Sequence, residues 1–413
     1  MCRNHPYWHH ACASTQATGS GLTRRQWLAR GAGALGLCAL ADWPSLLRAA
    51  ESAAPANLPH RAAKAPSLPV AIRRCVGYEP SVVREQLDAA LDGIGGIGQL
   101  VRGKTVTVKV NMTAPAEPFA GLPASRTYHI HPNVVAAACA ALDRAGARRI
   151  AIVEAWYHHE PVKTVLARAG WNVAGIEAAG GHKVVFENTR NRGTWGSYSR
   201  VKVPWGGYLF PAFELNGWYE HTDVFVSLGK MKDHAVGGVT MTSKNVFGIT
   251  PTALYGDDAP NEDTVQARVG PLHMNSRGLP AGVPAQLGDH PPKAAEIRVP
   301  RIVADLLGAR PVDLAIIDGV ESVAGGEGPW IQELRPVQPR LLFAGRNAIC
   351  TDSVCAAAMG YDARAGAGQF PFPGENHLHW AAEAGLGTND IHRIEMVGLA
   401  LSEARCKFRT PPA

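Results

Sequence analysis

The chain has 413 residues, 46% of them hydrophobic and 18% charged, which is enough for one large domain or for two that share a core. Its formal net charge of +6 is concentrated at the start, where residues 1–50 hold five arginines and one acidic residue. The remaining 36 basic and 34 acidic residues nearly balance, so the composition gives no support to nucleic-acid binding.

The first residues have the pattern of an export signal. Arg24 and Arg25 are followed closely by an aromatic residue and a leucine, and then by an apolar run over 31–41 that is too short to span a membrane. We therefore expect 1–41 to be a twin-arginine signal peptide, recognised by the twin-arginine export machinery, and the protein to be periplasmic or otherwise exported. A basic tail with a short buried helix is the alternative. We expect no stable membrane span in the mature chain.

Strand and helix patterns alternate after an Ala- and Pro-rich segment, 42–69, that is typical of a linker. The expected strands cover 104–110, 149–153, 183–186, 223–228, 313–317, 341–343 and 394–397, and the expected helices cover 81–91, 132–145, 161–169, 301–307, 349–359 and 375–384. Such alternation at short spacing predicts an α/β fold with a mostly parallel, doubly wound sheet.

Two segments depart from this alternation. Residues 188–217 are rich in Gly, Trp and Tyr and are predicted to form an antiparallel hairpin. Residues 250–300 are crowded with Pro, Gly, Asp and Asn and form a long irregular insertion, of a length that often covers a site or an interface. We expect one α/β domain over 70–413, and a division into two lobes stays open.

A cluster of cationic side chains follows the apolar strand expected at 223–228. Lys230, Lys232, His234 and Lys244 lie within fifteen residues of one another. Ligands of open α/β sheets bind at the carboxyl ends of the strands. A cation-rich loop at that edge favours a small anionic ligand, a lysine-based covalent step, or both. The alternative for Lys230 and Lys232 is a solvated surface pair.

Lys244 has surroundings that differ from those of the other lysines. It follows a glycine pair, Gly237 and Gly238, and precedes an apolar Val-Phe pair, which predicts partial burial. Burial lowers the pKa of a lysine and makes its amine a usable base or nucleophile. We therefore expect Lys244 and His234 to be catalytic, although His234 is also consistent with a metal ligand or a hydrogen-bonded structural residue.

Further polar residues follow other expected strands or open a late helix, where a carboxylate caps the helix or faces a cleft. Those expected to contact the substrate, with Lys230 and Lys232, are Lys109, Asn111 and Asn245. Those expected to orient the site or to bind a divalent ion are Glu154, Asp318, Glu327 and Asp352. Glu327 belongs to the glycine-rich turn 325–329, for which a plain tight turn is equally consistent.

The cysteines beyond residue 41 are scattered. Five remain there, and none belongs to a C-x-x-C pair, so we expect no iron–sulfur cluster and no zinc ribbon. Packing is the expected role of Cys139, Cys350 and Cys355.

Short segments in a fixed order match the pattern of a known family. They are Val-Lys-Val-Asn at 108–111, His-Pro-Asn-Val-Val at 131–135, Ser-Leu-Gly-Lys-Met-Lys-Asp-His at 227–234, Lys-Asn-Val-Phe-Gly at 244–248, Ile-Asp-Gly at 317–319, Gly-Gly-Glu-Gly-Pro at 325–329 and Thr-Asp at 351–352. On these segments the chain resembles, from about residue 104 to 360, the domain-of-unknown-function family numbered 362. Several members of that family carry ferredoxin-like cysteine clusters, which this sequence lacks, and the resemblance implies no established activity.

A second resemblance, to nickel-pincer lactate racemases, rests on the spacing of His234 and Lys244. In those enzymes a histidine lies ten residues before a glycine-preceded lysine that is covalently attached to the cofactor. The resemblance implies a similar site placement and a cofactor tethered to Lys244. Ser243 and Asn245 depart from the basic, glycine-rich surroundings of that lysine, and His273 lies further along than the family's downstream histidine.

The main hypothesis is an exported enzyme that acts on a small anionic substrate, a carboxylate or a phosphate, by proton transfer or isomerisation. Two alternatives stay open: a periplasmic ligand- or metal-binding protein without turnover, and a lactate-racemase-like enzyme with a lysine-tethered cofactor. A divalent metal is compatible with the acidic residues, and the sequence does not identify it.

Overall fold

A computed structural model describes residues 59–113, 115–190, 195–406 and 408–409, all within one compact unit, Pro55–Ala413. The expected signal peptide, 1–41, and most of the expected linker lie outside the described residues. No helix of the described part is long and apolar enough to cross a membrane.

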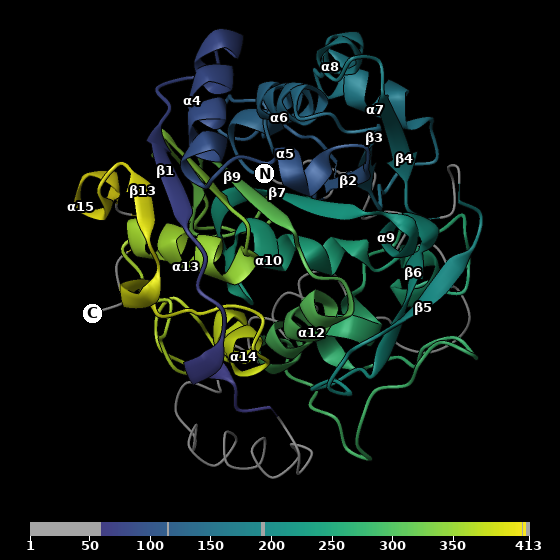
Figure 1. Cartoon of the computed structure of the whole chain (residues 1–413). Coiled ribbons are helices and arrows are strands. Elements are labelled where there is room, and N and C mark those ends of the chain that lie inside the picture. The colour runs from purple at the N-terminus through teal and green to yellow at the C-terminus, as the bar shows by residue number, and fades with distance from the viewer. Residues whose placement is uncertain (1–58, 114, 191–194, 407, 410–413) are drawn as a thin grey trace. The chain divides into compact units, whose positions relative to one another are not determined.

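A nine-stranded mixed sheet forms the centre of the described unit (Figure 1). Its strand order is β13-β1-β12-β9-β7-β2-β3-β4, and β8 pairs with β7. Most pairs are parallel, whereas β12 runs antiparallel to both β1 and β9. The strands of this sheet are β1 Val70–Arg74, β2 Thr105–Lys109, β3 Arg149–Glu154, β4 Val184–Asn188, β7 Val224–His234, β8 Gly238–Thr240, β9 Leu314–Gly319, β12 Leu341–Gly345 and β13 Met396–Gly398. The predicted α/β fold with a mostly parallel sheet is therefore confirmed.

Helices cover both faces of this sheet, as Figure 1 shows, and each face has its own apolar core. On one face, Leu87 of α4 and Val135 of α6 pack with sheet residues such as Ile152. On the other face, α12, α13 and α14 pack with residues such as Phe343. The helices are α4 Pro80–Gly93, α5 Gly98–Val101, α6 Pro132–Arg144, α7 Val162–Arg168, α8 Val173–Ala179, α9 Gly217–His221, α10 Met241–Asn245, α11 Thr252–Tyr255, α12 Ala295–Ala309, α13 Ala348–Ala358, α14 His377–Glu383 and α15 Leu401–Ala404.

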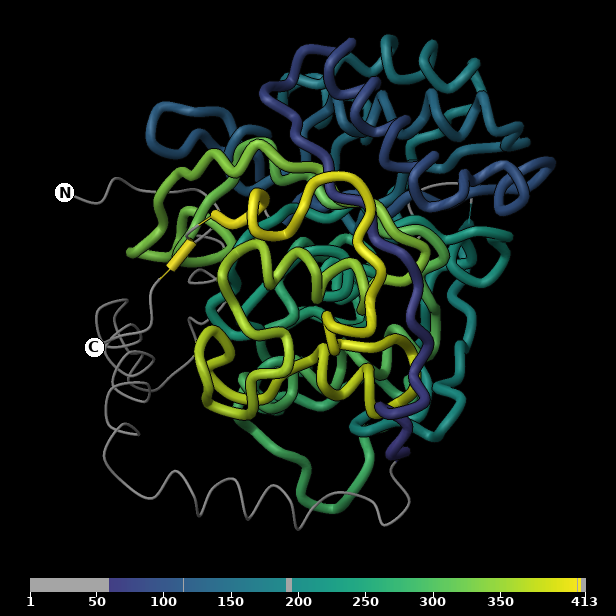
Figure 2. Tube along the Cα trace, turned by 60° about the vertical axis from the view of Figure 1, so that its left-hand side comes forward, coloured from purple at the N-terminus to yellow at the C-terminus, as the bar shows by residue number. Residues whose placement is uncertain are grey.

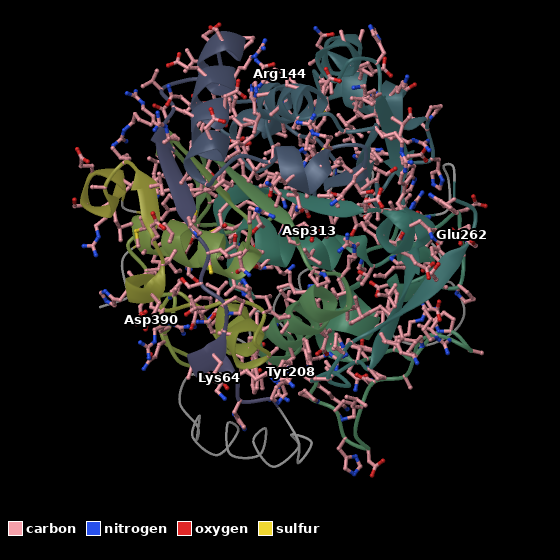
Figure 3. All side chains as sticks on the ribbon, viewed as in Figure 1. Lys64, Arg144, Tyr208, Glu262, Asp313 and Asp390 are labelled. Carbon is pink, nitrogen blue, oxygen red and sulfur yellow. The ribbon has the colours of Figure 1, made fainter. Side chains whose placement is uncertain are left out.

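The predicted hairpin is present, as β5 Tyr198–Lys202 paired antiparallel with β6 Ala212–Asn216. After β5 the chain turns toward α14, where the Tyr208 hydroxyl donates to the Trp380 carbonyl oxygen at 3.0 Å (Figure 3). A second small sheet pairs β10 Ser322–Ala324 with β11 Arg335–Val337.

The insertion at 250–300 is less irregular than its composition predicted. It contains α11 and a π-helical turn, Val269–Met274, and its last residues already belong to α12, which starts at Ala295 rather than near 301. The Arg298 guanidinium donates to the carbonyl oxygens of Pro271 and Leu272, so this segment is tied to α12 by buried hydrogen bonds. The buried arginine explains how a polar sequence forms ordered structure here.

The largest departure from the sequence prediction concerns β7. The sequence predicted a strand that ends at 228 and a cation-rich loop after it, but β7 continues through His234 and all its residues are buried. Gly229 makes this possible, because a Cβ atom there would lie 2.4 Å from the Met241 carbonyl carbon of α10. Lys230, Lys232 and His234 therefore belong to the sheet and not to a loop.

The two ends of the described unit meet at the edge of the sheet. Figure 2 shows β1, near the start of the unit, beside the C-terminal segment, and β1 pairs in parallel with β13. Arg409 then reaches β7, where its Nε lies 3.4 Å from Oδ2 of the fully buried Asp233. All five cysteines in the described ranges are free, and Cys139, Cys350 and Cys355 are buried, as expected for packing residues.

Candidate functional site

A cavity of about 80 Å³ lies where the carboxyl ends of β2, β3 and β7 meet α10. Sequence-predicted residues from five separate segments line it. Its charged lining consists of Lys109, Lys232, Lys244, Arg268, Glu154 and Glu327. Four cationic side chains thus face two carboxylates, with His234, Asn111 and Asn245 also in the lining.

An ion pair between Lys109 and Glu154 forms one wall of the cavity. The Lys109 Nζ lies 2.7 Å from Glu154 Oε2 and also donates to Asn245 Oδ1 at 3.1 Å. Burial lowers the pKa of Lys109, and the Glu154 carboxylate counters that effect. A side chain at position 248 would collide with this pair, because a Cβ on Gly248 would lie 2.8 Å from the Lys109 Nζ. The anchored lysine supplies a fixed positive charge.

Asn245 joins the strand ends to α10. Its Nδ2 donates to the Lys109 carbonyl oxygen at 3.2 Å and to Ser227 Oγ at 3.0 Å, and its Oδ1 accepts from Asn111 Nδ2 at 3.0 Å. The Asn111 Oδ1 is buried and has no hydrogen-bond partner among the described residues. Both asparagines were expected to contact the substrate, and both line the cavity, where Asn245 also has a clear structural role.

Lys232 is fully buried and is held by the main chain. Its Nζ donates to the carbonyl oxygens of Tyr128, at 2.7 Å, and Glu327, at 3.1 Å. Burial lowers the pKa of Lys232 to about 7; Glu327 opposes this, while the neighbouring Lys230 and Lys244 add to it. An anion in the cavity would therefore favour the charged form of this lysine.

His234 lies at the end of β7 beside Glu327. The ring Nδ1 accepts the Val236 and Gly237 N–H groups at 3.1 and 3.2 Å, which leaves the hydrogen of the neutral ring on Nε2. Burial lowers the pKa of His234 to about 3 despite the Glu327 carboxylate, 3.7 Å from Nδ1. In this neutral tautomer the Nε2–H group is available as a hydrogen-bond donor, and Nδ1 is occupied by the two main-chain N–H groups.

Glu327 lies opposite, on the turn that follows β10. Its Oε2 accepts the Ala235 N–H at 2.8 Å and its Oε1 accepts the Trp330 indole N–H at 2.9 Å. Burial alone would raise the pKa of Glu327, but His234 and these hydrogen bonds hold the pKa at about 2. The glycine-rich turn therefore carries a carboxylate that is ionised across the physiological range.

Lys244 is positioned by α10, whose first turn is capped by Asp352. Its Nζ forms no hydrogen bond or ion pair with the described residues and lies 4.1 Å from the centre of the Phe247 ring. Burial lowers the pKa of Lys244 to about 7, although Glu327 opposes that shift. The sequence predicted that Lys244 is partly buried, and the structure places it among the buried residues.

Lys230 and Asp318 lie outside the cavity lining and pair with each other. The Lys230 Nζ lies 2.8 Å from Asp318 Oδ2, both side chains are inaccessible to solvent, and the Tyr78 hydroxyl donates to Asp318 Oδ1 at 2.8 Å. The Lys230 Nζ also donates to the Ser125 carbonyl oxygen at 3.2 Å. The arrangement links β7 to β9 and gives Lys230 no route to a ligand in the cavity.

The acids expected to share a divalent ion do not converge. Asp318 pairs with Lys230, Glu327 is bound to the main chain and Trp330, and Asp352 lies beneath α10. Within the described ranges no group of three or more His, Cys, Asp and Glu side chains is arranged to hold a metal ion. The sequence left open whether these acids orient the site or bind a divalent ion, and their contacts in the described residues are those of groups that hold β7, the turn after β10 and α10 in place.

Sequence reasoning missed Arg268, which comes from the insertion at 250–300. Its guanidinium donates to the Thr250 carbonyl oxygen at 2.8 Å and to the Tyr157 hydroxyl, so it is fixed at the cavity wall. His273, from the same segment, packs edge-on against Phe247 with ring centres 5.2 Å apart. No periodicity or motif marks these residues, although the length of the insertion did predict a segment that covers a site.

The family described as a domain of unknown function (DUF362) matches residues 106–357. The chain belongs to this family. The matched segment runs from β2 into α13 and contains every cavity residue named above, so the site lies wholly within the family domain. The family's members share this stretch of chain, and the segments after 357 and before 106 lie outside the match.

Among solved structures, one similar chain is a Thermotoga maritima protein determined by a structural genomics consortium. It is 11% identical, with a TM-score of 0.31, and the match covers 62% of this chain and 53% of that chain. The match thus spans about half of the Thermotoga protein, and a likeness of this degree supports no argument. No curated protein matches the chain.

Proposed function

We propose that this protein is an enzyme that acts on a small anionic substrate, a carboxylate or a phosphate, by proton transfer or isomerisation. The observation that supports this is the cavity lining, in which four cationic side chains face two carboxylates and the Lys244 amine has no described partner. A cavity of about 80 Å³ has room for a ligand of roughly five to eight non-hydrogen atoms.

The anion would be held by cations that are already fixed in place. Arg268 and Lys232 are anchored by main-chain carbonyl oxygens, so they bind an anion without losing further side-chain freedom. Their fixed charges would also stabilise negative charge that develops on the substrate.

Lys244 and His234 would carry out the chemistry. A lysine whose pKa is about 7 is partly neutral at physiological pH and can accept a proton from carbon. The neutral His234 would donate a hydrogen bond from Nε2 to the substrate oxygen that becomes negative, a role that neutral imidazoles play in isomerases. Lys230 and Asp318 would act indirectly, by fixing β7.

Proton transfer is tested by hydrogen exchange, which needs no knowledge of the product. The protein is incubated in D₂O with a panel of small 2-hydroxy and 2-oxo carboxylates and phosphorylated analogues, and loss of the C–H signal beside the carboxylate or carbonyl is followed by NMR. We expect exchange for at least one compound, slowed on the order of 100-fold or more in Lys244→Met.

The matched control is Lys202→Met, since Lys202 is an exposed lysine of β5. Exchange that is equally fast in the Lys244 variant would show that the amine has no part in the reaction. Binding of a panel member without any exchange would instead favour a ligand-binding protein without turnover. A mass excess on Lys244 in the purified protein would favour the tethered-cofactor alternative.

We also propose export through the twin-arginine pathway, on the basis of Arg24 and Arg25. Replacing both by lysine should retain the chain in the cytoplasmic fraction of the producing cells. An unchanged distribution between cell fractions would contradict the proposal.

A further inference from the structure

We propose that Lys244 is a nucleophile that forms an imine with the carbonyl carbon of a small 2-oxo acid bound in the cavity. This inference rests on the proposed function and deepens it, because it names the substrate class and the covalent step.

The first argument is the difference between Lys244 and the other cations of the cavity. Lys109 is paired with Glu154, and Lys232 and Arg268 donate to main-chain carbonyl oxygens. These contacts hold the three side chains in fixed positions. The Lys244 Nζ has no such contact in the described chain, and it lies over the Phe247 ring. An amine in that position is free to attack an electrophile.

The second argument is the match between the cavity and the parts of a 2-oxo acid. The carboxylate would lie against Arg268 and Lys232, and the carbonyl oxygen would accept the Nε2 hydrogen of His234. Pyruvate has six non-hydrogen atoms, which is within the roughly five to eight that the cavity can hold. A cation beside the carboxylate and a donor beside the oxygen would leave the carbonyl carbon facing the amine.

The third argument is the protonation state. Burial lowers the pKa of Lys244 to about 7, so a substantial fraction of this amine is neutral near physiological pH, when an exposed lysine is almost fully charged. Only the neutral amine has a lone pair for attack on carbon.

The step balances without any further reagent. The nitrogen lone pair forms the C–N bond while the carbonyl π electrons move to oxygen, which His234 stabilises through its N–H. One proton passes from the nitrogen to the oxygen, which gives a carbinolamine. The second proton of the nitrogen then passes to the hydroxyl, which leaves as water when the C=N bond forms. The products are the lysine imine and one water molecule, and no atom is oxidised or reduced. Protonation of the imine acidifies the adjacent C–H bond. Because the Lys244 nitrogen is then part of the imine, a carboxylate of the cavity lining, Glu154 or Glu327, or water would accept that proton in place of the free amine.

The test is reductive trapping of the full-length protein with pyruvate and, separately, glyoxylate, each in the presence of sodium cyanoborohydride. Intact mass and peptide mapping locate the adduct. We expect one adduct, on Lys244, formed at least ten times faster than on any exposed lysine. Lys244→Arg should lose this adduct, and Lys202→Met should retain it.

Adducts spread over surface lysines, or none with either acid, would overturn the inference. Peptide mapping of the protein without substitutions decides this point, so the result does not depend on whether the Lys244→Arg variant folds. Exchange of pyruvate methyl hydrogens that depends on Lys244, without any adduct, would overturn the imine and leave the proposed function intact. A specific adduct without exchange would support the imine and contradict proton transfer, and absence of both would overturn both.

Discussion

The Asp352 carboxylate of α13 accepts the Ser243 N–H of α10 at 2.7 Å, one residue before Lys244. Its second oxygen accepts the Thr242 N–H at 3.1 Å, so one fully buried carboxylate caps the turn that carries Lys244. The sequence placed Asp352 among the supporting acids, and its support is mechanical, through the main chain of α10.

Replacing Asp352 by asparagine should therefore weaken both the fold and the site. The amide keeps the shape but offers one acceptor oxygen in place of two. The expected loss is on the order of 1–3 kcal/mol in the free energy of unfolding, measured by urea denaturation. The rate of trapping at Lys244 should fall as well. Ser353→Ala is the matched control, because the neighbouring Ser353 Oγ is buried and no described residue forms a hydrogen bond with it. Unchanged trapping in Asp352→Asn would contradict this account.

The Lys109–Glu154 pair should behave as a coupled unit. Glu154→Gln leaves a buried, uncompensated ammonium and is expected to cost on the order of 3 kcal/mol of unfolding free energy. The double variant Lys109→Met, Glu154→Leu removes both charges. Its loss of unfolding free energy should be smaller than the sum of the losses in the single variants Lys109→Met and Glu154→Leu. A double-mutant cycle measured by denaturation without ligand gives the coupling, expected to exceed about 1 kcal/mol. Simple additivity would show that the two side chains act independently.

Anion affinity should fall as the pH rises through about 7. Lys232 and Lys244 both have a pKa of about 7, lowered by burial, so at pH 6 both are largely charged and above pH 8 both are largely neutral. A bound anion favours the charged amines and raises their pKa. Binding near pH 7 should therefore take up protons, and binding at pH 6 should not.

Sulfate is a suitable probe, because its charge is constant over this range. Calorimetry in buffers of different ionisation enthalpy measures the proton uptake. Lys232→Met should weaken sulfate binding and flatten its pH dependence, whereas Lys202→Met should change neither. An affinity that does not vary between pH 6 and pH 8.5 would be incompatible with titration of these lysines.

The contact of Arg409 with Asp233 should stabilise the strand that carries the site. Asp233 is fully buried, and in the sequence it stands between Lys232 and His234. Burial raises the pKa of Asp233, and the positive charge of Arg409 counters that shift. Arg409→Ala should cost on the order of 1–3 kcal/mol at pH 7. Because the pKa of Asp233 is raised, Asp233 takes up a proton as the pH falls. The loss of unfolding free energy caused by Arg409→Ala should therefore become smaller at low pH. Arg405→Ala, at an exposed neighbour, is the control, and equal effects of the two variants would argue against the contact.

Sequence patterns predicted the strand–helix alternation because apolar periodicity directly reflects burial on two faces of a sheet. They also singled out His234 and Lys244, since glycines and apolar neighbours around a lysine indicate burial. They failed for the second half of β7, where the buried residues are charged. The burial of Lys230 depends on its partner Asp318, which is distant in sequence and therefore leaves no local pattern.

Arg268 could not be predicted for a related reason. It reaches the cavity from an insertion whose structure depends on buried hydrogen bonds to α12, and no local pattern encodes such contacts. The antiparallel direction of β12 could not be predicted either. An alternating pattern indicates that a strand is present, but it does not indicate the direction of that strand relative to its neighbours.

The continuity of β7 constrains how this site can change in evolution. Val224, Val226 and Leu228 pack in one core, and Lys230, Lys232 and His234 follow them on the same face of the same strand. A shift of one residue in register would turn all six to the opposite face, so neither the core nor the charges can be moved alone. Arg268 and its neighbours from the insertion are free of that constraint. New substrate preferences in this family are therefore expected to arise by substitution in that segment, with the lysine–histidine strand left unchanged.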